Sequence, residues 1–399
     1  MYCSSLSLTN FRNYKQLDVK LPNGPVLVLG ANASGKTTLL ESLYFLATTK
    51  SHRAGMDREL VNWDAQTDLG LPPFARVLAQ VQRRAPLTME IIVIREGGEA
   101  STGTSRKRIR VNDHPRKAID AIGQVNAVMF GPQDLDLIIG PPNLRRRYLD
   151  VTISQIDSHY VRSLQTYQKV VLQRNSLLKS LSERGRRAAP NELGEQLVFW
   201  DEELVREGGY LLRRRLEVVA QLGELANAIH ARLAGTDDPL EILYDSSVTQ
   251  AVECVAEPPN EIELMERYRR RLVEGRAEEQ RRAMTIAGPH RDDLLFRVGG
   301  VDMRTYGSRG QQRSVILAVK LAEVELMHET TGETPLLLLD DVVSELDPER
   351  RRYLLQAVLE HRQQVLVTAT DLIPVGREFL SRAHLMETSG PGGLIDRSG

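Results

Sequence analysis

The residues that most clearly indicate a reaction form a glycine-rich segment near the start of the chain. In order they are Gly30, Ala31, Asn32, Ala33, Ser34, Gly35, Lys36, Thr37 and Thr38. The spacing is that of a phosphate-binding loop: Gly, four residues, then Gly-Lys-Ser/Thr. Backbone N–H groups of such a loop, the N-terminus of the next helix and the charge of Lys36 bind a polyphosphate. Thr37 offers a hydroxyl to Mg²⁺, so the segment predicts a site for ATP or GTP.

Two aspartates supply the carboxylates that such a site needs. Asp340 and Asp341 follow the apolar run 336–339, which is typical of a buried strand. We expect Asp340 to hold the hydration shell of Mg²⁺. We expect Asp341 to orient the attacking water or to act as a general base.

The elements around these residues indicate an α/β domain that is divided by a helical arm. A short apolar strand, 25–29, precedes the glycine-rich segment, and a helix follows it. Strand-like patterns fill much of the first 140 residues. Helical patterns dominate 160–181, 193–233 and 261–284, and beyond these residues strand and helix patterns alternate again. We therefore expect an N-terminal part of the ATPase head at 1–142, a helical arm at 143–284, a C-terminal part of the head at 285–387 and a flexible tail at 388–399.

Two further segments resemble parts of ABC-type ATPases. Residues 344–347, Ser-Glu-Leu-Asp, resemble the D-loop, and residues 308–313, Ser-Arg-Gly-Gln-Gln-Arg, resemble the signature. In the signature a serine and a helix N-terminus bind a γ-phosphate, so the expected nucleotide contacts there are Ser308, Gly310 and Gln311. The resemblance implies the fold of an ABC-type P-loop ATPase head, with mixed sheets and flanking helices. It also implies that two copies meet head to tail, because one copy's loop and signature do not close on the same nucleotide.

One more segment is similar to the Q-loop of these ATPases. Residues 130–134 read Phe-Gly-Pro-Gln-Asp, and Gln133 would touch Mg²⁺ or the attacking water. An ordinary Gly-Pro turn is the alternative. The chain also departs from many ABC ATPases, because Asp341 stands where they carry glutamate and the segment 368–371 has no histidine to sense the γ-phosphate.

Composition limits the class of protein. Of 399 residues, 41% are hydrophobic and 26% are charged, and the two cysteines are far apart, so we expect neither a disulfide framework nor a cysteine metal site. No apolar run approaches the ~20 residues of a membrane helix, and the first residues lack the apolar core of a signal peptide. We expect a cytoplasmic protein with no membrane partner. The net charge of −1 does not itself favour nucleic acid, yet arginines cluster at several places, either as solvated helix faces or as parts of a DNA-binding patch.

Nearly the whole chain resembles the RecF family of bacterial recombination mediators, which are SMC-like ABC ATPases. The segments that carry this resemblance are 8–14, 51–53, 144–150, 288–293 (Gly-Pro-His-Arg-Asp-Asp), 307–313 and 339–347. It implies an ATP-dependent homodimer that closes on duplex DNA near gaps or single-strand/double-strand junctions, without sequence specificity. It further implies weak, DNA-stimulated ATP hydrolysis with Mg²⁺, and action with RecR and RecO in loading recombinase during recombinational repair and replication restart.

Several basic residues are candidates for contact with DNA. Arg53 resembles the arginine that SMC-type ATPases place after the phosphate-loop helix to sense DNA, although a solvated loop arginine is the alternative. The cluster Arg106, Lys107, Arg108 and Arg110 lies near a predicted hairpin and would follow a phosphate backbone. His290 is interpreted as a structural residue that links arm and head. Two other functions remain open: the ATPase subunit of a DNA-processing nuclease, and the energy subunit of a transporter, which the long helical insertion disfavours.

Overall fold

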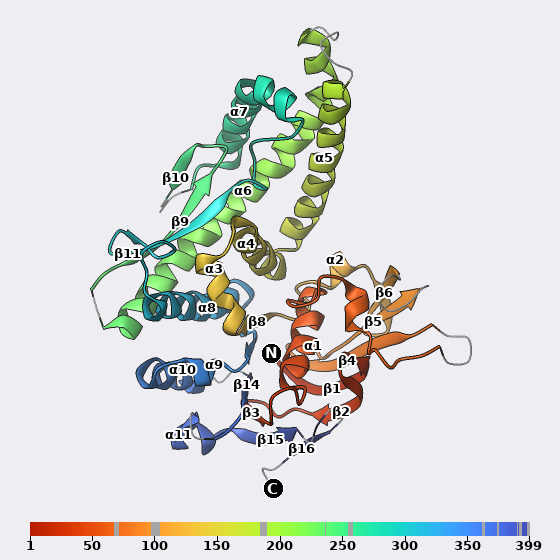
Figure 1. The fold of residues 1–399 in the computed structure, drawn as a ribbon, viewed down its shortest axis with the longest axis vertical. Helices are drawn as coiled ribbons and strands as arrows, with labels where there is room; N and C mark the ends of the chain where they lie inside the picture. Colours follow the sequence, from red (N-terminus) through yellow and green to blue (C-terminus); the bar gives the residue numbers. More distant parts are fainter. Residues whose placement is uncertain are drawn as a thin grey trace. The chain divides into compact units, whose positions relative to one another are not determined.

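The computed structural model describes residues 1–67, 72–96, 104–183, 190–235, 237–253, 258–360, 364–372, 375–388, 390 and 393–396. The chain forms two compact units (Figure 1). Unit 1 comprises Met1–Asp134 and Glu323–Gly399, and unit 2 comprises Leu135–Ala322. The sequence also predicts a hairpin turn at Gly97-Gly98 and a break between two long helices at 185–190. Both fall almost entirely outside the described residues, as does most of the tail after residue 388.

Unit 1 contains an antiparallel sheet in the order β2-β1-β4-β5-β6-β7. Its strands are β1 (Tyr2–Phe11), β2 (Tyr14–Lys20), β4 (Phe74–Gln82), β5 (Leu87–Glu96), β6 (Thr104–Val111) and β7 (His114–Arg116). Apolar residues alternate with polar ones along these strands, so that one face is buried. On β6, for example, Ile109 and Val111 are buried while Arg108 and Arg110 are exposed.

A second sheet of unit 1 carries the predicted phosphate loop. Its order is β16-β15-β3-β14-β13-β8, and the strands are β3 (Pro25–Leu29), β8 (Ala127–Phe130), β13 (Leu336–Leu339), β14 (Val365–Ala369), β15 (His384–Thr388) and β16 (Leu394–Asp396). All neighbours except β15 and β16 pair in parallel. The carboxyl ends of β3, β14, β13 and β8 therefore meet at one edge of the sheet, where ligands of open α/β sheets bind.

One hydrophobic core joins the two sheets of unit 1. Helix α1 (Lys36–Thr48) contributes Leu39, Leu43 and Phe45, which belong to the same cluster as Leu8 of the first sheet and Val26 of the second. The shorter elements of the unit are η1 (Asp57–Leu60), α2 (Ala118–Ala121), η2 (Pro132–Leu135, which ends in unit 2), α9 (Val342–Glu345), α10 (Pro348–Glu360) and α11 (Arg377–Leu380). Packing of α1 onto this core fixes the start of the helix, and hence the glycine-rich loop, relative to both sheets.

Unit 2 is mainly helical, as the sequence predicts. It contains α3 (Asp136–Ile139), α4 (Pro142–Ile156), α5 (Ser158–Glu183), α6 (Pro190–Ala234), α7 (Glu261–Arg282) and the first part of α8 (Arg309–Thr331). Helices α5 and α6 lie side by side, and α7 packs on α6 (Figure 1). No helix within the described ranges combines the length and apolar character needed to cross a membrane.

Unit 2 differs from the expected arm in two respects. It contains a small antiparallel sheet, β10-β9-β11-β12, formed by β9 (Leu240–Ser246), β10 (Ala251–Glu253), β11 (Asp293–Val298) and β12 (Val301–Asp302), where mostly helical texture was expected. The sheet pairs β9 with β11, which lies about 50 residues further along the chain. Because of that pairing, residues 285–322 lie in unit 2, although the sequence placed them in the head.

Buried arginines connect elements of unit 2 that are far apart in the sequence. Arg145 binds both carboxylate oxygens of Asp293, at 2.6 and 2.9 Å. Arg174 donates two hydrogen bonds to Glu279 and one to Asp201. Arg215 donates to Asp150 at 2.7 Å and to the carbonyl oxygen of residue 289 at 2.6 Å. Arg145 and Arg215, each from a run of three arginines, are therefore neither solvated nor available to DNA, whereas Arg213 is exposed and pairs with Glu217 four residues along its helix.

His290 belongs to the same buried region. Its Nδ1 lies 2.7 Å from the hydroxyl of Tyr167, which in turn lies 3.0 Å from the hydroxyl of Tyr268. Burial lowers the pKa of His290 to about 4, so the ring is neutral near pH 7. Gly288 approaches the two tyrosines so closely that a Cβ there would lie about 2.1 Å from the hydroxyl of Tyr268. Most of the Gly-Pro-His-Arg-Asp-Asp segment thus packs inside unit 2, while Arg291 is exposed and donates to the carbonyl oxygen of Thr285.

Candidate nucleotide site

The glycine-rich loop connects β3 to α1 in a strand–loop–helix arrangement, as the motif requires. Ala33 and Gly35 have positive φ angles of 63° and 103°, which turn backbone N–H groups toward the inside of the loop. A Cβ on Gly35 would lie 2.8 Å from the hydroxyl of Tyr14, and one on Gly30 would lie 1.8 Å from Oγ1 of Thr388. The two glycines are therefore required by close packing as well as by backbone conformation.

Lys36 places its charge inside this loop. Its Nζ donates hydrogen bonds to the carbonyl oxygens of Gly30, at 2.6 Å, and Ala31, at 2.9 Å. Burial lowers the pKa of Lys36, and the charges of Asp341 and Asp340 act in the opposite direction. The ammonium group therefore lies within the loop, with the two carboxylates near enough for their charge to act on it, and the outer phosphates of a nucleotide need such a cation.

Thr37 and Asp340 meet at the edge of the second sheet. The hydroxyl of Thr37 donates to Oδ1 of Asp340 at 2.9 Å, and the hydroxyl of Thr368, on β14, donates to the same oxygen at 3.0 Å. Burial raises the pKa of Asp340, while the two hydroxyls and the charge of Arg53 lower it. A hydroxyl and a carboxylate brought together in this way are oxygen ligands of the kind that Mg²⁺ takes in phosphate-loop sites. The residues present fit the ion that the sequence predicts.

Asp341 and Gln133 lie at the same sheet edge. Asp341 adopts a left-handed backbone, with φ of 55°, at the start of α9, and Ser344 donates to its carboxylate at 2.7 Å. Gln133 is exposed on η2, directly after β8, and β8 pairs with the strand that ends at Asp340. A Cβ on the intervening Gly131 would lie only 3.6 Å from the Cβ of Asp340. The structure thus brings both candidate water-positioning residues to the carboxyl end of β13.

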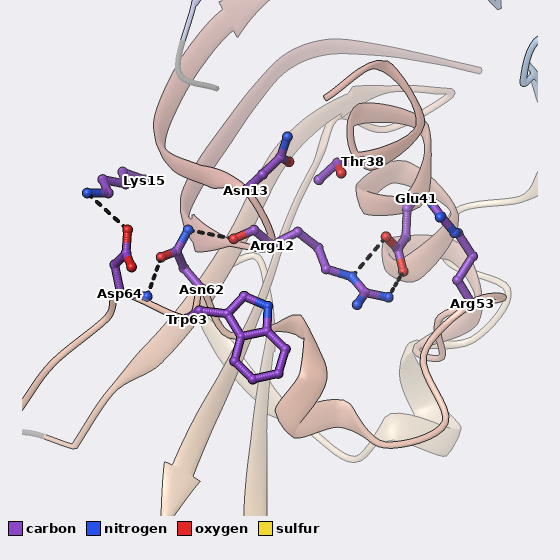
Figure 2. A pocket seen from close by; sticks show the side chains of 9 residues that line it. All are labelled: Arg12, Asn13, Lys15, Thr38, Glu41, Arg53, Asn62, Trp63 and Asp64. Atoms are coloured by element: carbon purple, nitrogen blue, oxygen red, sulfur yellow. Dashed lines mark hydrogen bonds and ion pairs between the residues drawn. The ribbon is translucent and has the colours of Figure 1, made fainter. Parts of the chain in front are cut away.

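A cavity of about 860 Å³ lies beside α1 in unit 1 (Figure 2). It is lined by Arg12, Asn13, Lys15, Thr38, Glu41, Arg53, Asn62, Trp63 and Asp64. Arg12 donates to both carboxylate oxygens of the buried Glu41, at 2.7 and 3.1 Å, and Trp63 is 73% exposed. Of these residues, only Thr38 and Arg53 were predicted as site residues. Arg12 and Asn13 lie in the segment 8–14, which the sequence links to a family resemblance but not to a site.

The predicted DNA-contacting residues separate into three groups. Arg106, Arg108 and Arg110 are exposed on β6. Lys107 takes the opposite side of the strand, where its Nζ contacts the carbonyl oxygen of Thr49 at 2.5 Å. Arg53 lines the cavity described above. Alternation along a strand explains why neighbours in the cluster differ in this way.

Ser308 caps the N-terminus of α8 in unit 2. Its hydroxyl accepts from the N–H of Gln311 at 3.2 Å, and its own N–H donates to the side chain of Gln311 at 2.9 Å. This reciprocal pair is a capping box, and both residues are exposed, while Gly310 is half-buried. The start of a 23-residue helix is therefore presented to solvent with glycine in its first turn, which suits an anion. Within one chain the signature residues lie in unit 2, and the phosphate loop lies in unit 1.

Comparison with known proteins supports the family resemblance that the sequence motifs indicate. The family described as "RecF/RecN/SMC N terminal domain" matches residues 2–373. The DNA replication and repair protein RecF of Chloroflexus aggregans is 47% identical over 389 residues, which cover 96% of this chain and 97% of that protein. The protein of the same name from Roseiflexus castenholzii is 48% identical over 388 residues, with 96% and 97% covered.

Solved structures of similar proteins have the same fold as this chain. A structure described as the recombination mediator protein RecF-ATPrS in the RecFOR pathway has a TM-score of 0.84 at 30% identity, covering 100% of this chain and 98% of that one. An Smc head bound to the C-winged helix domain of ScpA has a TM-score of 0.53 at 13% identity, covering 100% and 98%, and this likeness concerns the fold alone. The predicted fold class, an ABC-like ATPase head with mixed sheets and a helical insertion, is confirmed. The chain belongs to the RecF family of DNA replication and repair proteins.

Proposed function

We propose that this chain is an ATP-switched DNA-binding protein that acts as a recombination mediator, and that ATP joins two copies of it. The observation that carries the proposal is the division of the nucleotide-binding residues between the two units. The phosphate loop and Asp340 lie in unit 1, whereas the exposed signature cap, Ser308, lies in unit 2. A second copy offers its own Ser308 to complete the site, as the resemblance to ABC-type ATPases implies.

The reaction proposed for this site is ATP hydrolysis by the groups described above. The loop N–H groups and Lys36 are proposed to bind the phosphates, and the cavity that Thr38 helps to line would take the rest of the nucleotide. Thr37 and Asp340 would hold Mg²⁺, which neutralises charge on the outer phosphates. Water then attacks the γ-phosphorus as the bond to the β–γ bridging oxygen breaks, giving ADP and inorganic phosphate.

Asp341 and Gln133 are proposed to position that water. The carboxylate of Asp341 is already bonded by Ser344, so part of its hydrogen-bonding capacity goes to the D-loop. An aspartate is also one methylene shorter than the glutamate of many ABC ATPases. Both features favour weak hydrolysis that times the release of DNA over rapid turnover.

DNA is proposed to bind the outer face of β6 through Arg106, Arg108 and Arg110, with Arg53 responding from the cavity. Exposed arginines on alternate positions of one strand point the same way and contact phosphates without reading bases. Lys107 is not part of this set, because its ammonium group is engaged on the other side of the strand. Gapped or junction DNA, and action with RecR and RecO, follow from the family resemblance.

The test is sedimentation velocity of the chain with and without Mg-ATP, beside the variant Ser308→Arg. Arginine at the cap is expected to leave ATP bound to monomers and to abolish the ATP-induced dimer. A matched control is Thr166→Arg, which adds the same charge on an exposed site of α5 and is expected to dimerise normally. A parent that stays monomeric with ATP bound, or a Ser308→Arg dimer, contradicts the composite site.

A further inference from the structure

Strand β6 presents different chemistry on its two sides. Arg106, Arg108 and Arg110 are exposed on one side, and Lys107 extends from the other, where its side chain is 16% exposed. Neighbouring residues of β6 therefore lie on opposite sides of the strand, one side forming a basic surface and the other facing the interior of unit 1.

The ammonium group of Lys107 holds two points of one segment. Its Nζ donates to the carbonyl oxygen of Thr49 at 2.5 Å and lies 2.9 Å from the carboxylate of Asp57. It also lies 5.0 Å from the centre of the Phe45 ring, a favourable cation–π position. Thr49 caps the end of α1, where a cation complements the helix dipole. One side chain thus holds both ends of the segment 49–57.

Arg53 lies in the middle of that segment. The hydroxyl of Ser51 accepts from the backbone N–H groups of Arg53, at 2.9 Å, and Ala54, at 2.8 Å, and it donates to the buried Glu41 at 2.5 Å. Arg53 lines the cavity, and its charge acts on Asp340. A short, internally bonded segment therefore connects the ammonium group of Lys107 to Arg53, which lines the cavity and whose charge lowers the pKa of Asp340.

We propose that Lys107 is a positioning residue that transmits the occupancy of the arginine face of β6 by nucleic-acid phosphates to Arg53, and so to ATP hydrolysis. The inference rests on the proposed function, because it needs DNA to stimulate hydrolysis. Its physical basis is that β6 cannot shift under a phosphate backbone without moving the group that holds both ends of the segment 49–57. Lys107 itself touches neither DNA nor nucleotide.

The experiment compares Lys107→Gln, Lys107→Arg and Arg108→Gln with the parent, measuring ATP hydrolysis with and without duplex DNA and the salt dependence of DNA binding. Lys107→Gln is expected to keep DNA-free hydrolysis and DNA affinity, and to reduce the stimulation by DNA about fivefold or more. Lys107→Arg keeps the charge and is expected to restore much of the stimulation. Arg108→Gln is expected to weaken DNA binding, lower the salt slope by about one and still reach full stimulation at saturating DNA.

A second readout follows the segment directly. The chain has two tryptophans, and Trp63 lines the same cavity as Arg53. In a Trp200→Phe background, DNA is expected to change the emission of Trp63, and Lys107→Gln is expected to abolish that change without loss of binding. Full stimulation in Lys107→Gln, or an equal fall of its DNA-free and DNA-stimulated rates, overturns the proposal. A parent that DNA does not stimulate overturns the proposed function itself, and the coupling with it.

Discussion

Unit 1 and unit 2 use buried charge in opposite ways. In unit 1 the charged groups of the site gather at the carboxyl ends of parallel strands, beside a cavity, with Lys36 and Asp340 held by neutral hydroxyls and carbonyls. In unit 2, Arg145, Arg174 and Arg215 are each at most 1% exposed, and carboxylates of the same unit neutralise them. One unit keeps charge available to a ligand, and the other uses charge to determine its own packing.

This difference indicates what a substitution does in each place. A buried ion pair adds little net stability over apolar residues of the same shape, but removing one partner leaves an uncompensated charge. The charges of Lys36 and Asp340 at the nucleotide site are instead partly compensated by hydrogen bonds to neutral groups, and the phosphates of a bound nucleotide would complete that compensation. Loss of a buried arginine should therefore destabilise unit 2, whereas loss of a charge at the phosphate loop should leave unit 1 folded and inactive.

The strongest test of the comparison is Arg174→Met in unit 2. Glu279, fully buried, then loses its partner, and we expect a loss of about 3–5 kcal/mol in the free energy of unfolding. Urea unfolding followed by Trp200 fluorescence, in a Trp63→Phe background, measures unit 2. Adding Glu279→Leu is expected to restore most of the loss. If Arg174→Met unfolds like the parent, the buried charges of unit 2 do not hold its packing together.

His290 gives the next largest effect, and it depends on pH. Its pKa is about 4 in the folded chain and 6.5 in the unfolded one, so the unfolded state binds more protons between these values. The contribution to stability is complete above pH 6.5 and is lost as the pH falls toward 4, by on the order of 3 kcal/mol. Unfolding titrations of the parent and of His290→Asn at several pH values measure the difference in slope. Parallel curves would show that His290 titrates normally in the folded state.

Local sequence patterns predict the candidate nucleotide site, and its contacts with nucleotide stay a prediction. Residues 30–37 adjoin one another in sequence and adopt a conformation that glycines and a helix start largely determine. Asp340 is predicted because an acidic residue directly after a buried apolar strand is the expected partner of a phosphate loop; the structure adds that this strand ends at the same sheet edge as β3. The three long helices could also be predicted, because each shows a helical pattern of apolar residues over at least 22 residues.

Long-range pairing was not predictable from the sequence. Arg145 and its partner Asp293 are 148 residues apart, so nothing near Arg145 shows that it is buried. Strands β9 and β11 likewise pair although the whole of α7 lies between them in the chain, so the sequence did not reveal the small sheet of unit 2. Residues 285–322 belong to unit 2 together with that sheet. Alternation in 106–110 separates odd from even positions, yet only the tertiary fold decides which side faces solvent.

Asp340→Asn is expected to lower activity without lowering stability, whereas Arg174→Met is expected to lower stability. The amide keeps the shape and can still accept from Thr37 and Thr368, so unit 1 should unfold as in the parent. It removes the charge that Mg²⁺ needs, and hydrolysis should fall about 100-fold or more. Phosphate release in saturating ATP and DNA, together with Trp63 fluorescence in urea, separates the two quantities. Large destabilisation of unit 1 would mean that Asp340 serves the fold in the way the arginines of unit 2 do.

The smallest effect is expected where unit 2 carries charge on its surface. Arg206 bonds Glu203 at 2.6 Å and Glu207 at 3.1 Å, yet its side chain is 56% exposed. Water and salt screen such a pair, so Arg206→Gln is expected to lower the free energy of unfolding by about 1 kcal/mol at most, and less in high salt. The same urea experiment as for Arg174→Met measures it, and the two arginines differ mainly in burial. A loss as large as that of Arg174→Met would mean that ion pairing itself, irrespective of burial, holds the helices of unit 2 together.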